Sequence, residues 1–220
     1  MKKIALIVAA GSGSRMHSPL PKQFMELNGK PLLMHTFRAF KKADPDFEFV
    51  LVLPEKEIDT WKRLCKKFGF NIKHSIAKGG KSRFHSVKNG LKQIGDEGIV
   101  FIHDGVRPLV SAKTIENCFQ TALAHGNALP VILPSESVRR VSGGKSEAVD
   151  RTRYYLVQTP QTFRVQLIKK AYEQKYSEKF TDDASVLENT GASIYLVEGN
   201  RENIKITWPA DLTIAAALLV

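Results

Sequence analysis

Short apolar runs alternate with amphipathic segments along most of this 220-residue chain. Runs of strand length occupy residues 4–10, 47–53, 99–103 and 129–133, and 71–76 is a weaker candidate strand. Apolar character on both faces of so short a segment is typical of buried parallel strands. The rhythm predicts an α/β fold, a three-layer α/β/α sandwich around a mostly parallel, Rossmann-like sheet.

Four amphipathic helices are predicted between these strands. The first follows Pro31, a favourable first-turn residue, and the second and third end at Gly69 and Gly95. The fourth begins after Ser111, whose side chain can cap it, and ends near Gly126. In such sheets ligands bind beyond the carboxyl ends of the strands, so we expect the site residues in the loops that follow them.

The alternation of apolar runs and amphipathic segments is interrupted between residues 134 and 158. Segments 136–141 and 148–151 flank a Ser-Gly-Gly-Lys turn, which predicts a two-stranded hairpin. An inserted hairpin of this length usually protrudes, and a disordered surface loop is the alternative interpretation. We therefore expect a single domain, 1–220, with an inserted β-arm, 134–158, that forms dimer contacts.

Five further elements are predicted after the arm. They are a helix around 165–176, a short helix after Asp183, strands at 194–198 and 204–207, and a final helix from Pro209. The final helix has apolar residues at helical spacing. No internal repeat or low-complexity segment interrupts these elements.

Composition narrows the class of partner. The formal net charge of +11 favours anionic partners and leaves nucleic acid and phosphorylated metabolites both open. Cys65 and Cys118 lie in helical patterns among apolar neighbours, so we expect reduced, packed thiols rather than metal ligands. No stretch approaches 18 consecutive apolar residues, and a glycine-rich loop rather than a convincing signal-cleavage site follows the apolar start. These features predict a cytoplasmic protein.

The loop after the first strand carries the strongest functional pattern, Ala-Ala-Gly-Ser-Gly-Ser-Arg-Met at 9–16 followed by Pro-Lys-Gln at 21–23. Glycines let the backbone approach an anion closely, and consecutive N–H groups then form a phosphate cradle. Arg15 adds a rigid fork of donors and Lys22 a mobile point charge, which suit a polyphosphate that gains negative charge during transfer. The pattern is neither G-x-G-x-x-G, because Met16 breaks it, nor a P-loop. A glycine-rich turn without chemistry is the alternative.

Two further positions suit phosphate chemistry. Asp104 ends an apolar strand on the expected ligand side of the sheet, three residues before Arg107. One carboxylate with phosphate oxygens and waters is the usual arrangement around Mg²⁺, whereas an aspartate after a strand can also simply cap the next turn. Lys205 lies between two isoleucines and so points to the face opposite them, although a surface lysine would fit the same pattern. His103 is interpreted as a structural histidine.

Seven short patterns in the chain resemble those of the 2-C-methyl-D-erythritol 4-phosphate cytidylyltransferases, in the nucleotidyltransferase superfamily. They occur in family order at 9–23, 79–87, 103–108, 149–151, 159–161, 181–185 and 203–207. Any one could arise by chance, but seven in register along essentially the whole chain are specific. The resemblance implies transfer of CMP from CTP to 2-C-methyl-D-erythritol 4-phosphate, with release of pyrophosphate. It also implies Mg²⁺ as cofactor and a homodimer, with neither nucleic acid nor a membrane as partner.

The resemblance also implies which residues hold the nucleotide. Arg15 and Lys22 would stabilise the α-phosphate of CTP, and Asp104 would help to hold Mg²⁺ on the triphosphate. The residues expected to bind CTP are Ala9, Ala10, Gly11, Ser12, Gly13, Gly80, Lys81 and Ser86. Lys81 stands where the family commonly has an acidic residue, which leaves it a backbone role.

The acceptor site is implied in the same way. The residues expected to bind the acceptor are Asp104, Gly105, Arg107, Ser137 and Thr159. The residues expected to catalyse the transfer are Arg15, Lys22, Arg151 and Lys205. Ser137, Arg151 and Thr159 would come from the second subunit of the dimer. Glu136-Ser137 replaces the typical Asp-Thr in the arm, and Gly105-Val106 replaces a pair of alanines.

Three other functions are possible readings of this pattern. A pentitol-phosphate cytidylyltransferase, for example one that uses ribitol 5-phosphate, shares the fold and most motifs, but the Ala9-Ala10-Gly11 start favours the methylerythritol enzyme. A basic nucleic-acid-binding module would show clustered cations with stacking aromatic residues or a helix-turn-helix, and no such module occurs. A non-catalytic sugar-nucleotide-binding relative would not need the five residues Arg15, Lys22, Asp104, Arg151 and Lys205 together.

Overall fold

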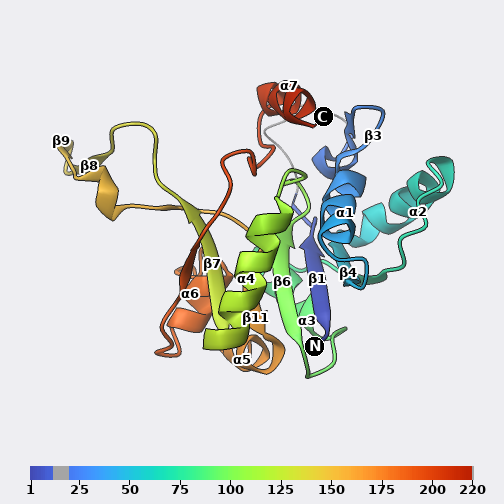
Figure 1. Ribbon diagram of the computed structural model, residues 1–220, viewed down its shortest axis with the longest axis horizontal. Helices are drawn as coiled ribbons and strands as arrows, with labels where there is room; N and C mark the ends of the chain where they lie inside the picture. Colours follow the sequence, from blue (N-terminus) through green and yellow to red (C-terminus); the bar gives the residue numbers. More distant parts are fainter. Residues whose placement is uncertain (12–19, 220) are drawn as a thin grey trace.

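A mixed sheet of eight strands forms the centre of the fold (Figure 1). The computed structural model describes residues 1–11 and 20–219. The strand order is β10-β7-β11-β6-β1-β4-β5, and β12 also pairs with β7. The strands are β1 (Lys3–Val8), β4 (Glu48–Leu53), β5 (Ser75–Lys78), β6 (Ile99–Asp104), β7 (Asn127–Ile132), β10 (Leu156–Val157), β11 (Gln161–Arg164) and β12 (Leu196–Glu198). β1 runs parallel to both β4 and β6, and β4 parallel to β5, so the predicted, mostly parallel sheet is confirmed.

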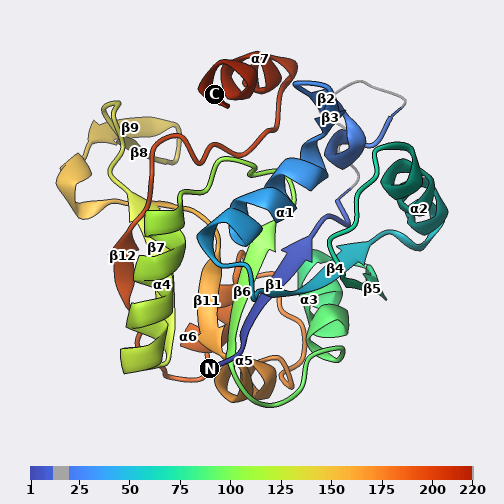
Figure 2. The same cartoon turned by 45° about the vertical axis from the view of Figure 1, so that its right-hand side comes forward.

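Helices cover both faces of this sheet, as Figure 2 shows. They are α1 (Leu32–Ala43), α2 (Ile58–Lys67), α3 (Arg83–Leu91), α4 (Ala112–His125), α5 (Val165–Ala171), α6 (Asp183–Glu188) and α7 (Pro209–Leu218). α1, α2 and α4 share one buried cluster with Ala5 and Ile7 of β1, whereas α3, α5 and α6 share another with Ile4 and Leu6. Because side chains alternate along a strand, β1 supplies both clusters, and the predicted three-layer sandwich is confirmed.

The last helix, α7, lies beyond the ends of the sheet strands rather than on either face (Figure 1). It packs near a short hairpin of β2 (Glu26–Leu27) and β3 (Lys30–Pro31). Ala215 of α7, Leu27 of the hairpin and Ile206 belong to one small buried cluster. This cluster anchors the chain end next to the segment that carries Lys205.

Four sequence predictions need correction, and one is the strand expected at 71–76, because β5 spans Ser75–Lys78 and residues 71–74 lie outside it. Gln161–Arg164 form an antiparallel strand between β6 and β7 that was not predicted, because Phe163 is its one large apolar residue and no run marks it. The predicted strand 204–207 is wrong: this segment is irregular backbone that leads to α7, attached through the hydrogen bond from the Ile206 N–H to the Val106 carbonyl, 3.0 Å. The helix predicted over 165–176 already ends at Ala171.

The predicted hairpin is confirmed. β8 (Arg139–Ser142) and β9 (Lys145–Ala148) pair in antiparallel register, and their residues are exposed. Gly143 and Gly144 have φ values of 54° and 76° at the turn, where a tight hairpin turn of type I′ requires positive φ at both central positions. Figure 1 shows the hairpin reaching away from the sheet at one side of the molecule.

A half-buried histidine, His74, is expected to make the stability of this fold depend on pH. The Trp61 indole N–H donates to His74 Nε2 at 2.9 Å, and His74 Nδ1 lies 2.7 Å from the Ile72 carbonyl. The indole can only donate, so Nε2 accepts and the neutral ring carries its proton on Nδ1. Burial lowers the pKa of His74 below its ordinary value.

We expect the free energy of unfolding to fall as pH drops below about 6.5, because there the unfolded chain binds protons that the folded His74 does not. Stability from this group is complete above that pH. The His74→Gln variant keeps an acceptor for Trp61 but does not titrate, so its stability should fall less steeply with pH. Urea unfolding of both proteins between neutral and mildly acidic pH measures the two slopes, and equal slopes would contradict the prediction.

Candidate active site

The candidate site lies at the carboxyl ends of β1 and β6, where an α/β sheet of this kind binds ligands. Val8, the last residue of β1, is in register with Asp104, the last residue of β6. Ala9, Ala10 and Gly11 continue from β1 past Asp104. The structure therefore brings the start of the glycine-rich loop and the strand-end carboxylate together.

A cavity of about 500 Å³ opens at this point. Its lining residues are Val8, Ala9, Ala10, Gly11, Lys22, Gln23, Gly80, Lys81, Ser82, Arg83, Ser86, Asp104, Val106 and Lys205. Six of the eight residues expected to bind CTP are among them. The other two, Ser12 and Gly13, and the expected catalytic residue Arg15 lie outside the described residues.

The loop before α3 forms one wall of this cavity through close backbone packing. The Gly80 N–H donates to Ser86 Oγ at 3.0 Å, and the Ser86 hydroxyl donates to the Ser82 carbonyl at 2.9 Å. A Cβ on Gly80 would lie 2.4 Å from the Cβ of His85, and one on Gly79 would lie 2.7 Å from that of Ala10. Both positions thus need glycine, and the Ser86 hydroxyl fixes the loop.

Asp104 is the electrostatic centre of the site. Its Oδ2 lies 3.0 Å from Lys205 Nζ and 3.4 Å from Arg107 Nε, and its Oδ1 lies 3.9 Å from Arg83 Nε. Burial alone would raise the pKa of Asp104, but Lys205, Arg83 and Arg107 hold it well below its ordinary value. The carboxylate is therefore ionised and surrounded by three cations that attract phosphate.

A second cavity, of about 310 Å³, lies on the other side of Asp104. Its lining residues are Arg83, Asp104, Arg107, Val157, Gln158, Thr159, Gln161, Thr181, Asp182 and Lys205. Three residues, Arg83, Asp104 and Lys205, line both cavities. Two anionic ligands, one in each cavity, would meet at this shared wall.

The expected acceptor residues divide into two groups. Arg107 and Thr159 line the second cavity of their own chain, so Thr159 does not need a partner subunit to reach the site. Gly105 is buried against Ala9 and lines neither cavity, because its small size serves packing there. Ser137 and Arg151 are exposed on the arm and line neither cavity of their own chain.

Asp104 is fixed by a buried chain of hydrogen bonds. The Asp104 N–H donates to Thr159 Oγ1 at 3.1 Å, and the Thr159 hydroxyl lies 3.0 Å from His103 Nδ1. His103 Nε2 lies 2.9 Å from the Arg107 carbonyl, which can only accept, so Nε2 carries the ring proton. Burial lowers the pKa of His103 to about 4. Both ring nitrogens are thus used in structure, and neither faces a substrate.

Among the lining residues that were not predicted from the sequence, Arg83 and Gln23 bear most on ligand binding. Arg83 lies within the 79–87 pattern but had no expected role. The feature that could have indicated a role is its position three residues after Gly80, at the start of α3. Gln23 lines the larger of these two cavities, is 2% exposed, and its Nε2 has no hydrogen-bond partner in the described part of the chain. An unsatisfied buried donor in a cavity wall is expected where a ligand supplies the acceptor.

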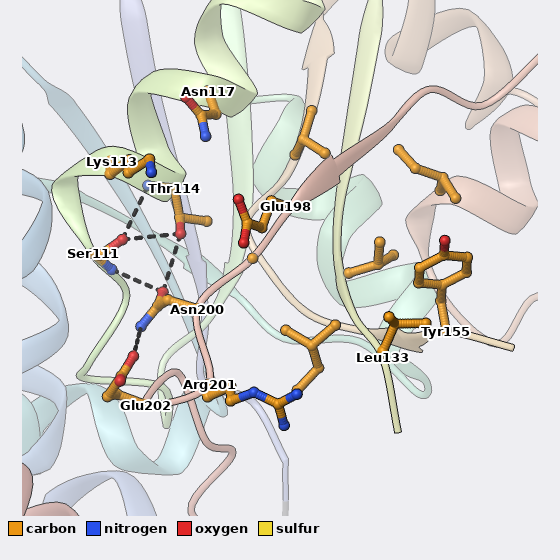
Figure 3. Close-up of a pocket in the computed structure, with 15 residues that line it drawn as sticks. Ser111, Lys113, Thr114, Asn117, Leu133, Tyr155, Glu198, Asn200, Arg201 and Glu202 are labelled. Carbon is orange, nitrogen blue, oxygen red and sulfur yellow. Dashed lines mark hydrogen bonds between the residues drawn. The ribbon is translucent and has the colours of Figure 1, made fainter. Parts of the chain in front are cut away.

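A further cavity of about 670 Å³ lies away from this site, between the start of α4, the end of β7, β12 and the loop after it (Figure 3). Tyr155, at the base of the arm, and Leu133 form part of its wall, and Lys113 and Arg201 also line it. No residue expected from the sequence to bind substrate lines it. Leu133 and Tyr155 are exposed and lie at the base of the arm, so this cavity belongs with the arm rather than with the site around Asp104.

Asp104 is the carboxylate that lines both cavities. Within residues 1–11 and 20–219, no three His, Cys, Asp or Glu side chains gather as a metal cluster. Mg²⁺ is commonly bound through one or two carboxylates together with substrate phosphates, so a lone carboxylate in a phosphate-sized cavity fits this ion.

Within residues 1–11 and 20–219, none of the helices has the length and apolar character needed to cross a bilayer.

Solved structures with this fold identify the class of protein. The 4-diphosphocytidyl-2C-methyl-D-erythritol synthase of Anaerococcus prevotii superposes with a TM-score of 0.83 at 26% identity, covering 99% of this chain and 98% of that one. The 2-C-methyl-D-erythritol 4-phosphate cytidylyltransferase of Francisella tularensis has a TM-score of 0.80 at 30% identity, covering 98% of both chains. The fold is that of a cytidylyltransferase.

Sequence comparison identifies the family. The model of the 2-C-methyl-D-erythritol 4-phosphate cytidylyltransferase (IspD) family matches residues 3–220. Relatives of that name from Bacteroides fragilis and Bacteroides thetaiotaomicron are 54% and 51% identical over 219 residues, covering 100% of both chains in each case. This chain belongs to the 2-C-methyl-D-erythritol 4-phosphate cytidylyltransferase family.

Proposed function

We propose that this chain transfers CMP from CTP to 2-C-methyl-D-erythritol 4-phosphate in the non-mevalonate synthesis of isoprenoid precursors. The products are 4-diphosphocytidyl-2-C-methyl-D-erythritol and pyrophosphate. Family membership supports the substrates, and one structural observation supports the chemistry. Two cavities meet at a wall with Asp104 and Lys205, so a nucleotide phosphate and an acceptor phosphate can be brought into contact there.

The reaction needs charge screening more than proton transfer. An oxygen of the acceptor phosphate forms a bond to the α-phosphorus of CTP, and the bond from that phosphorus to the oxygen bridging to the β-phosphorus breaks. The electron pair leaves with pyrophosphate. The acceptor phosphate is already ionised near neutral pH, so no general base is required. Arg15, Lys22, Arg107 and Lys205 would screen the two polyanions and stabilise the charge that develops in the transition state.

The cavity wall suggests how the nucleotide is held. Ala9, Ala10 and Gly11 present backbone groups at the end of β1, and Gly80 and Lys81 present theirs from the loop before α3. Ser86 would act by holding that loop in place. Arg15, Ser12 and Gly13 remain expected contacts to the phosphates.

We assign Mg²⁺ to Asp104 together with phosphate oxygens of CTP. The side chain of Asp104 is 10% exposed, lines both cavities and is ionised, as a metal ligand must be. When bound, the ion would neutralise part of the triphosphate charge. Lys205 Nζ lies 3.0 Å from the same carboxylate. When Mg²⁺ and substrate bind, Lys205 would leave Asp104 and pair with a substrate phosphate.

The arm is proposed to form a homodimer of single-domain chains, 1–220, through residues 134–158. Large apolar side chains at the base of the arm are 42–50% exposed, and they are Leu133, Tyr154, Tyr155, Leu156 and Val157. An apolar patch of this kind commonly marks a protein interface. Ser137 and Arg151 lie outside both cavities of their own chain, which supports their placement in the acceptor site of the partner.

The free thiols Cys65 and Cys118 support a reducing, cytoplasmic location.

Pyrophosphate release with CTP, Mg²⁺ and a panel of polyol phosphates tests the proposed reaction. We expect turnover with 2-C-methyl-D-erythritol 4-phosphate, and turnover lower by about 10²-fold or more when ATP or GTP replaces CTP. The preference for CTP is expected from membership of the cytidylyltransferase family. Faster turnover with ribitol 5-phosphate would instead assign the chain to the pentitol-phosphate enzymes.

A further inference from the structure

The wall between the two cavities contains one cation that the proposed function does not yet use. Arg83, Asp104 and Lys205 line both cavities. Asp104 and Lys205 have expected roles in metal and acceptor binding. Arg83 occupies the same shared position, at the first residue of α3, and its side chain is 31% exposed there.

The guanidinium of Arg83 is held at one end by a buried carboxylate. Its Nη1 and Nη2 donate to the two oxygens of Asp183 at 2.7 and 2.6 Å. The Tyr172 hydroxyl donates to Asp183 Oδ1 at 2.6 Å, and both Asp183 and Tyr172 are buried. Such a bidentate pair fixes the plane of the guanidinium.

The other end of the guanidinium faces the reaction site. Arg83 Nε lies 3.9 Å from Asp104 Oδ1, which is too long for a hydrogen bond. A guanidinium has five N–H donors, and the pair with Asp183 occupies one on each terminal nitrogen. Within residues 1–11 and 20–219 Arg83 makes no other hydrogen bond, so the Nε donor and the parallel donor of the adjacent terminal nitrogen are left for a phosphate at the shared wall.

We propose that Arg83 is a further catalytic residue, which contacts the transferring phosphoryl group, and that Asp183 and Tyr172 are its positioning residues. This inference rests on the proposed CMP transfer. Arg83 donates hydrogen bonds to oxygens of the α-phosphate as the bond to the acceptor oxygen forms and the bond to pyrophosphate breaks. Because Asp183 fixes the donors before substrate binds, they need no reorganisation during the reaction.

The Arg83→Lys variant tests the contact directly. Lysine keeps the positive charge. Its single ammonium group cannot form the bidentate pair with Asp183 and at the same time present fixed donors to a phosphate. We expect the turnover number at saturating CTP and acceptor to fall about 10²-fold, with smaller changes in the two Michaelis constants. Free guanidinium ion should restore part of the turnover of Arg83→Ala, which a purely structural role would not allow.

Two conservative variants test the positioning. Tyr172→Phe removes one hydrogen bond to Asp183, and we expect turnover to fall several-fold because the guanidinium loses part of its orientation. Gln174→Ala is the matched control, since Gln174 Nε2 donates to the Val186 carbonyl at 3.0 Å and joins the α5 end to α6 without contacting Arg83. It should lower the melting temperature and leave turnover per folded molecule unchanged.

The outcomes separate this inference from the proposed function. A wild-type protein that releases no pyrophosphate with CTP and any polyol phosphate overturns both. If the wild type is active and the turnover number of Arg83→Lys lies within twofold of it, the role of Arg83 is overturned and the proposed function stands. If Arg83→Lys does not fold, Tyr172→Phe decides: a fall in turnover no larger than in Gln174→Ala overturns the inference.

Discussion

Lys22→Ala is expected to lower the turnover number about 10³-fold, with less effect on the Michaelis constant of the acceptor. Lys22 begins a short 3₁₀ turn, Lys22–Phe24, and lines the larger of the two cavities that meet at Asp104. A cation in this position stabilises the charge that builds on the α-phosphate, which is greater in the transition state than in bound CTP. Steady-state pyrophosphate release over a range of CTP and acceptor concentrations measures the effect.

Lys78→Ala is the matched control for the loss of a lysine charge. Lys78 ends β5, is 64% exposed and pairs with Glu55 rather than with any residue of the cavity. Its replacement should leave turnover near that of the wild type. Near-normal turnover of folded Lys22→Ala would show that the phosphate site is not at the end of β1.

Mixing inactive Lys22→Ala and Arg151→Ala subunits, after unfolding and refolding, should restore about a quarter of wild-type activity. Arg151 is exposed at the base of the arm and lines neither cavity of its own chain, so we expect it to complete the acceptor site of a partner. A mixed dimer then has one site with both defects and one with neither. Random reassortment makes half of the dimers mixed, and half of their sites are intact.

The parent variants provide the controls for this experiment. Each should stay nearly inactive when refolded alone, and native mass spectrometry reports the fraction of mixed dimers. If Arg151 serves its own subunit, every site in a mixed dimer keeps one defect and activity stays at the parent level. That result, with mixed dimers confirmed by mass, would exclude exchange of the arm and leave the proposed reaction untouched.

The candidate site could be predicted in part because its residues follow strands. Asp104 ends an apolar run, and the loop at 9–16 follows another, so the topology of a parallel sheet is enough to expect them together. Arg83 could not be assigned in this way. Its partner Asp183 lies 100 positions further along the chain, and only the tertiary structure, which brings the first residues of α3 and α6 together, reveals that one end of the guanidinium is occupied.

The same contrast applies to the fold. β1, β4 and β6 were predicted because both of their faces are buried, and that leaves a continuous apolar run. β11 was missed because its buried residues Gln161 and Thr162 are polar, and the hydrogen bonds that make this burial possible come from distant segments. Gln161 Oε1, for example, accepts from the Ala184 N–H at 2.8 Å.

Periodicity and short patterns were thus sufficient for the layers, the hairpin and the family, because each depends on residues close together along the chain. The meeting of two cavities at Arg83, Asp104 and Lys205 depends on three segments that are far apart in sequence. Lys205 reaches Asp104 from irregular backbone that was predicted as a strand, since the contact is set by where that segment packs and not by its local pattern.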